Sequence, residues 1–191
     1  MKTEIIDTIR KLANLTEPEI QEFIDLSKVK SFPAKSHFIR AGQVPAEVGF
    51  VLKGLFRYVY ISEEGKEFTK AFMPERSFLS SYSAMISKTA SYFFIQALEN
   101  AEILSISYDN WLKLKKLNPK WNLLLVQLLE KGYAVKEKRE REFLLLDAEC
   151  RYRIFLEEFP SLENRVKQHM VASYLGITPI ALSRIRKKMR T

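Results

Sequence analysis

Apolar residues within Phe32–Leu104 fall in short runs that turn residues such as Gly54 and Pro74 separate. Runs of this kind are typical of β-strands. Upstream, Thr16 followed three residues later by Glu19 is the pattern of a helix N-terminus, so short helices are expected before the strands. The first half is therefore predicted to be a β-roll or barrel, with strands over 49–52, 55–61, 67–72, 92–95 and 101–107.

The pattern then changes to a helical period. Asn118-Pro119 ends one predicted helix, which is capped by Asp109, and no further proline occurs before Leu146. Apolar or small residues recur there at alternating steps of four and three, the spacing of a coiled-coil seam: Trp121, Leu125, Leu128, Gly132 and Val135. Such a seam predicts dimerisation, and a helix packed on its own domain is the alternative.

Residues 166–189 have the spacing of two short helices joined by a tight turn. Gly176 can adopt the positive φ that ends the first helix, Thr178 is an N-cap for the second, and Pro179 fits its first turn. Leu182 belongs to the apolar stripe of the second helix, whose other face is left exposed. The segment predicts a DNA-binding helix-turn-helix, and an αα-hairpin with a solvated basic face is the alternative.

The exposed face of the second helix carries groups that can bind DNA. An arginine fork can bond O6 and N7 of guanine together, so Arg184 is predicted to reach a base edge. Thr178, Ser183 and Lys187 are expected to hold phosphates. Two residues at the start of the first helix are expected to meet the DNA backbone as well, so the predicted DNA-binding residues are Lys167, Gln168, Thr178, Pro179, Ile180, Ser183, Arg184, Lys187 and Lys188.

Charge and cysteine content narrow the class of protein. The formal net charge is +8, and the end of the chain carries five cations and no acid: Arg184, Arg186, Lys187, Lys188 and Arg190. A basic cluster attracts phosphates. The single cysteine, Cys150, excludes an intrachain disulfide and an all-cysteine metal cluster, and no apolar stretch is long enough for a membrane span. We expect a cytoplasmic protein with no membrane partner.

These residues together resemble the Crp/Fnr family of bacterial transcription regulators over nearly the whole chain. The resemblance rests on the glycine-punctuated roll with Gly42, Phe50–Gly54 and Arg57, on the long helix after Pro119, and on Leu175–Arg186. It implies an α+β fold with an N-terminal double-stranded β-helix (jelly-roll-like) sensor domain of the cyclic-nucleotide-binding type over 1–118. A long dimerisation helix over 119–146 and a small all-α helix-turn-helix domain over 147–191, without a full wing, complete the expected organisation.

The effector segment departs from the pattern of family members that bind cyclic AMP. Ser80-Ser81 stands where such members carry Gly-Glu, and residues 89–94 contain no arginine. A buried phosphate without a cationic partner is costly, so ordinary cyclic AMP binding is not expected. The roll could hold a different, less charged small-molecule effector, with a predicted pocket of Phe78, Ser80, Ser81, Tyr82, Ser83, Ser91, Tyr92 and Phe93, and barrel core is the alternative for the aromatic residues.

Other classes of function find less support. The only histidines, His37 and His169, fall in different predicted parts, so no metal or haem site is expected. Residue sets typical of hydrolytic enzymes and nucleotide-binding loops do not occur, so an enzyme is not expected. The predicted partners are palindromic double-stranded DNA and a second copy of the chain, with RNA polymerase as a candidate partner. A module that senses an effector and acts through protein contacts, without binding DNA, remains the alternative function.

Overall fold

The computed structural model describes residues 2–190 in two compact units. Residues up to Val59 together with Phe72–Lys131 form the first unit, and Tyr60–Ala71 with the residues from Gly132 onward form the second. The predicted parts 1–118, 119–146 and 147–191 divide the chain at other points. The long helix is shared between the two units, and the tip of one hairpin belongs with the C-terminal helices.

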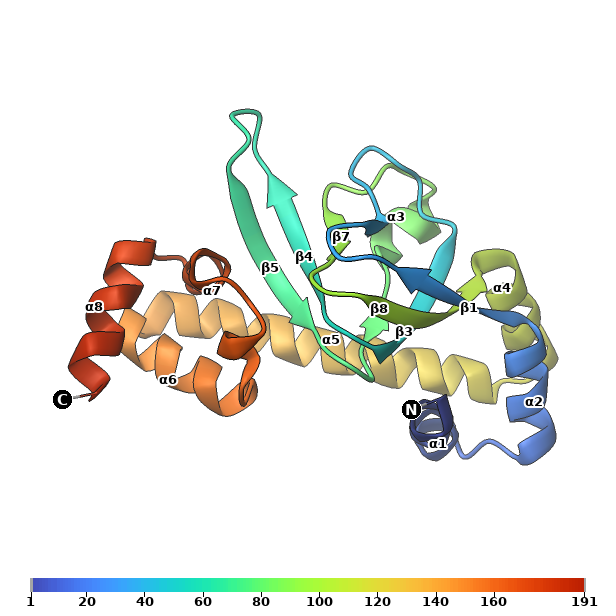
Figure 1. The fold of residues 1–191 in the computed structure, drawn as a ribbon. Coiled ribbons are helices and arrows are strands. Elements are labelled where there is room, and N and C mark those ends of the chain that lie inside the picture. The colour runs from blue at the N-terminus through green and yellow to red at the C-terminus, as the bar shows by residue number, and fades with distance from the viewer. Residues whose placement is uncertain (1, 191) are drawn as a thin grey trace. The chain divides into compact units, whose positions relative to one another are not determined.

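The β-roll consists of two four-stranded sheets (Figure 1). Their orders are β1-β8-β3-β6 and β2-β7-β4-β5, and the pairs β1–β8, β3–β8, β3–β6, β2–β7 and β4–β7 are antiparallel. The strands are β1 Ser27–Phe32, β2 His37–Ile39, β3 Glu47–Lys53, β4 Phe56–Ile61, β5 Glu67–Met73, β6 Phe78–Leu79, β7 Phe94–Ala97 and β8 Ala101–Ser107. With the helices around them, these sheets confirm the predicted α+β class.

Local capping signals set where the flanking helices begin. They are α1 Lys2–Ala13, α2 Glu17–Asp25, α3 Tyr82–Ser87, α4 Tyr108–Leu117 and α5 Lys120–Leu145. The Glu19 carboxylate accepts a hydrogen bond from Thr16 N at 2.6 Å, half of a capping box at the start of α2. The predicted cap of α4 was wrong, because Ser107 Oγ accepts from Asn110 N at 3.2 Å and Asp109 lies inside the helix.

Aromatic side chains fill the core of the first unit. The Phe23 ring lies 5.3 Å from Trp121 and 5.9 Å from Phe50, and Trp111 lies 6.1 Å from Trp121. Both tryptophans are fully buried. The first turns of α5 are therefore part of this core.

The second unit contains the C-terminal helices. These are α6 Ala148–Glu158, the 3-10 turn η1 Leu162–Asn164, α7 Gln168–Leu175 and α8 Pro179–Arg190. Asp147 caps α6 by accepting from Cys150 N at 2.8 Å, and the Phe155 ring packs 5.6 Å from that of Tyr174. Among the described residues, no helix has the length and apolar character that a membrane span requires.

Candidate functional site

The turn between α7 and α8 requires a glycine. Gly176 has φ of 69°, in the left-handed region, and ends α7. A Cβ at this position would lie 2.7 Å from a ring carbon of Phe143, so a side chain does not fit there. The apolar spacing of the first helix predicts a buried face of Met170, Val171, Tyr174 and Leu175. The last three are buried together with the small Ala172, and Met170 is partly buried.

The second helix, α8, begins as predicted. Thr178 Oγ1 accepts a hydrogen bond from Ala181 N at 3.2 Å, and Pro179 is the first helical residue. Leu182 is fully buried. The opposite face is exposed and presents Ile180, Ser183, Arg184, Lys187 and Lys188, so α8 combines an anchored apolar side with a hydrogen-bonding and cationic side.

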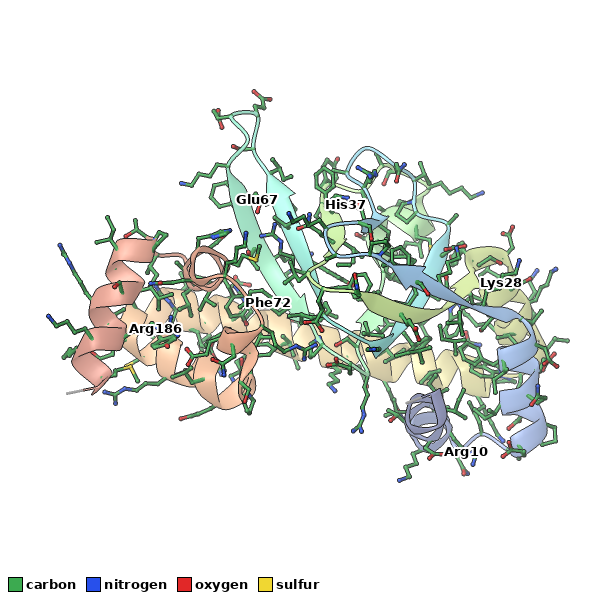
Figure 2. All side chains as sticks on the ribbon, in the orientation of Figure 1. Arg10, Lys28, His37, Glu67, Phe72 and Arg186 are labelled. Carbon is green, nitrogen blue, oxygen red and sulfur yellow. The ribbon has the colours of Figure 1, made fainter. Side chains whose placement is uncertain are left out.

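Two cations of α8 form ion pairs within the unit. Arg186 Nη2 lies 2.7 Å from Glu163 Oε2, and the Tyr152 hydroxyl donates to the same oxygen at 2.7 Å. Lys188 Nζ lies 2.7 Å from Glu149 Oε2. The sequence groups Arg186, labelled in Figure 2, with the exposed cations. The structure instead half-buries its side chain and pairs it with Glu163, which holds α8 against η1. The side chain of Arg190 lies outside the described residues.

The two residues predicted at the start of α7 differ in role. Gln168 Nε2 donates to Pro179 O at 3.3 Å, so this amide links α7 to α8 in the structure. Lys167 is exposed and makes no side-chain cap at the N-terminus of α7. Both lie on the helix-turn-helix, and their contact with a DNA backbone stays a prediction.

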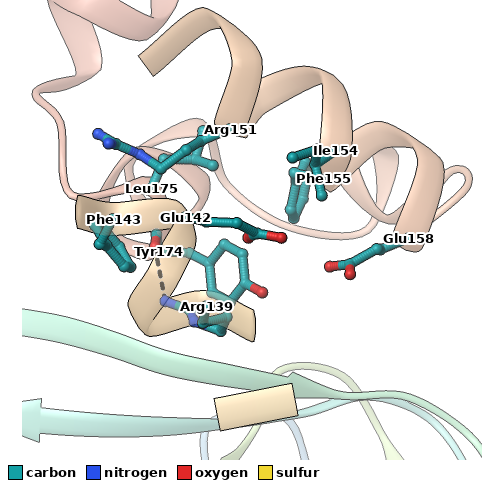
Figure 3. Close-up of a pocket in the computed structure, with 9 residues that line it drawn as sticks. All are labelled: Arg139, Glu142, Phe143, Arg151, Ile154, Phe155, Glu158, Tyr174 and Leu175. Atoms are coloured by element: carbon teal, nitrogen blue, oxygen red, sulfur yellow. Dashed lines mark hydrogen bonds between the residues drawn. The ribbon is translucent and has the colours of Figure 1, made fainter. Parts of the chain in front are cut away.

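A cation from α5 holds the C-terminal end of α7. The Arg139 guanidinium lies 3.6 Å from the centroid of the Tyr174 ring, and its Nη2 donates to Tyr174 O at 3.1 Å (Figure 3). A cation is favourable near the last carbonyls of a helix. Burial raises the pKa of the Tyr174 hydroxyl to about 12, so this side chain stays neutral. The cluster lines a small pocket with Glu142, Phe143, Arg151, Ile154, Phe155, Glu158 and Leu175.

The predicted effector residues are only partly brought together. Ser80, Ser81, Ser91 and Phe93 are buried, and Ser91 Oγ lies 3.0 Å from Ser81 Oγ. Phe78 and Tyr82 pack against the core of the first unit. Tyr92 and Ser83 are exposed, Tyr92 to 85%, and do not lie with the buried serines, so their place in an effector pocket stays a prediction.

Tyr58 is the residue of this region that sequence reasoning missed. Its ring stacks on Phe93 at 5.1 Å, and its hydroxyl accepts from Ser80 N at 2.9 Å and lies 3.3 Å from Ser80 O. Burial raises the pKa of this hydroxyl well above its usual range. Tyr58 therefore fills the space beside the serines, and no local sequence signal distinguishes it from the other aromatic residues of the strands.

The predicted dimer seam also needs correction. Trp121 and Leu125 are buried in the core of the first unit, and Leu128 packs against that core, so these three face their own domain. Gly132 and Val135 are exposed. On the outer face of α5, Leu123 and Val126 are each 48% exposed and Leu129 is 41% exposed. These three residues form an exposed apolar stripe on α5, but it lies on a different face of the helix from the predicted seam.

Comparisons with known proteins agree with this fold. The cyclic nucleotide-binding domain family matches residues 29–118. The cAMP-activated global transcriptional regulator CRP of Salmonella typhimurium is 21% identical over 132 residues, 69% of this chain and 63% of the relative. The CRP of Haemophilus influenzae is 22% identical over 144 residues, 75% of this chain and 64% of the relative. The matched region thus spans less than two thirds of either relative.

Two solved structures share the fold over most of the chain. The c-di-GMP responsive global regulator CLP of Xanthomonas campestris superposes with a TM-score of 0.72 at 18% identity, covering 92% of each chain. A CooA mutant of Carboxydothermus hydrogenoformans superposes with a TM-score of 0.70 at 20% identity, covering 87% of this chain and 78% of that one. The resemblance read from the residues is confirmed at the level of the fold: residues 29–118 match the cyclic nucleotide-binding domain family, and most of the chain shares the fold of the solved regulator CLP.

Proposed function

We propose that the chain is a sequence-specific DNA-binding transcription regulator, not an enzyme, whose reading element is α8. The observation that carries this proposal is the anchored and capped helix with one exposed cationic face. Leu182 and the Arg186–Glu163 pair fix the rotation of α8 about its axis, which leaves Ser183, Arg184 and Lys187 outward. A helix presented in this way fits the major groove.

The regulator acts as a homodimer on a palindromic site. A single short reading helix contacts few base pairs, and two-fold symmetry doubles the contacts with half-sites about 34 Å apart. The apolar stripe of Leu123, Val126 and Leu129 on α5 supports an interface between two copies, because exposed apolar side chains at steps of three are costly in water. RNA polymerase is a further candidate partner.

The roll does not hold cyclic AMP in the usual way. A cyclic phosphate needs backbone N–H donors and a cation. The N–H of Ser80 is already bound by Tyr58, and the buried Arg57 bonds Gln96 Oε1 at 3.1 and 2.9 Å. If an effector binds, its recognition depends on groups other than a charged phosphate.

Selection of bound sequences from a pool of genomic fragments tests the function. The full chain should enrich a palindrome, and its affinity should fall steeply with salt concentration. Arg184→Ala should relax the base preference at one position of each half-site, whereas Lys187→Ala should weaken binding to all sequences alike. Retention without a palindrome and without salt dependence would favour the alternative, an effector-sensing module that acts through protein contacts.

A further inference from the structure

A side chain of α7 binds the edge of β5. β5 is the last strand in the order β2-β7-β4-β5, so within residues 2–190 no further strand lies beside its outer backbone groups. Thr69 N donates to Ser173 Oγ at 2.9 Å, and Ser173 Oγ donates to Glu67 O at 3.2 Å (Glu67 is labelled in Figure 2). The Ser173 hydroxyl thus accepts a hydrogen bond from one N–H of the strand edge and donates one to a carbonyl of it, as the backbone of a neighbouring strand would do.

This contact is unusual for a serine inside a helix. Such a serine commonly donates to the carbonyl four residues earlier in its own helix. Ser173 instead bonds a strand 104 residues away in the chain. The Thr69 side chain is 5% exposed, and its Oγ1 has no hydrogen-bond partner within the described part of the chain. The Thr69 side chain at the hairpin edge is therefore shielded from solvent by the residues that pack on it.

Adjacent residues of α7 are bound by two different elements. Ser173 bonds the hairpin, and Tyr174 is bound by Arg139 of α5 through its ring and its carbonyl. Phe143, one turn after Arg139, contacts the place where a Cβ of Gly176 would lie. None of these contacts uses the exposed face of α8. They fix the position of the helix pair and leave its DNA-facing side chains unchanged.

We propose that Ser173 is a positioning residue: its hydroxyl sets the angle of the helix-turn-helix by holding α7 to the β4–β5 hairpin. This inference rests on the proposed DNA-binding function. A dimer that reads two half-sites at one fixed spacing needs its two reading helices at a defined angle. A helix pair held only by Arg139 and Phe143, both of α5, could pivot about that one helix, and it would accept half-sites at more than one spacing.

Two variants of the full chain separate this role from folding. Ser173→Ala removes the hydroxyl and favours helix, so the chain should fold. Ser173→Thr keeps a hydroxyl and serves as the matched control. Hydrogen exchange without DNA should become faster at the Thr69 amide in Ser173→Ala and stay near the wild-type rate in Ser173→Thr.

DNA binding gives the second readout. Wild-type protein and Ser173→Thr should prefer the selected half-site spacing over spacings longer by one or two base pairs. Ser173→Ala should lose that preference by roughly fivefold, the effect of one neutral hydrogen bond. The affinity of all three proteins for a duplex with a single half-site should be equal, because the reading face is unchanged.

The outcomes distinguish the two proposals. Unchanged exchange at Thr69 in Ser173→Ala would show that the contact is absent in solution, and unchanged spacing preference would show that the contact does not position the helices. Either result overturns the role of Ser173 while DNA binding stands. A wild-type chain that binds no duplex would overturn the proposed function and the positioning role together, even if the exchange data show the contact.

Discussion

At the scale of single residues, the Glu19 carboxylate joins three parts of the first unit. It accepts from Thr16 N at 2.6 Å, pairs with Lys120 Nζ at 3.0 Å and accepts from Asn118 Nδ2. These contacts, the backbone N–H of Thr16 first among them, lower the pKa of Glu19 to about 2. The ionised form is thus the one that links the start of α2 to the start of α5.

Glu19→Gln should lower the melting temperature of the chain at pH 7 by a few degrees, because the amide cannot replace the charged acceptor. A lowered folded-state pKa gives stability that is fully present above the unfolded value of 4.5 and is lost as the pH falls toward about 2. The difference between Glu19→Gln and wild type should therefore shrink over this interval. Thermal unfolding at several pH values measures it, with Glu22→Gln as a control for the same charge change on α2. Identical profiles for the two variants would contradict the role of the cap.

The residues that could be predicted from the sequence are those whose signals are local. Thr178, Pro179 and Gly176 lie within four positions of one another, and each has a strong preference at a helix end. Tyr58 and Ser173 act through contacts with segments far away in the chain. No nearby pattern marks them, so they could be found only in the folded chain.

At the scale of elements, the first half of α5 shows where periodicity fails. Residues 123–126 read Leu-Leu-Leu-Val, and Leu128-Leu129 follows, so apolar side chains cover more than one face of the helix. A step pattern of four and three can be drawn through either face. Tertiary packing decides between them, and it buries the face with Trp121 and Leu125 in the first unit.

The proposed interface therefore lies on the face of Leu123, Val126 and Leu129. Val126→Glu should convert a dimer into a monomer, because it places one charge from each copy at the contact. Val135 is 54% exposed and follows Val126 by nine residues, about 900° of helical rotation, which puts it on the opposite side of α5. Val135→Glu is thus the matched control and should leave the dimer intact. Analytical ultracentrifugation measures both, and the reverse pattern would restore the seam first predicted from the sequence.

At the scale of the whole molecule, a ligand of the roll would control the proposed DNA binding only if it binds two states of the chain with different affinity. Cyclic AMP is a poor candidate, because Tyr58 occupies the N–H of Ser80 and residues 89–94 supply no arginine. The affinity of the chain for its selected palindrome should therefore be the same with and without saturating cyclic AMP. Fluorescence anisotropy with labelled duplex measures this, and the cAMP-activated CRP of Salmonella typhimurium is the positive control in the same assay.

A tenfold gain in DNA affinity on adding cyclic AMP, about 1.4 kcal/mol of coupling, would mean that the roll rearranges around Tyr58 to hold the phosphate. In that case Tyr58→Phe, which releases the Ser80 N–H, should strengthen cyclic AMP binding further. If Tyr58 instead keeps the Ser80 N–H occupied, calorimetry should detect no cyclic AMP binding to the wild-type protein or to the variant.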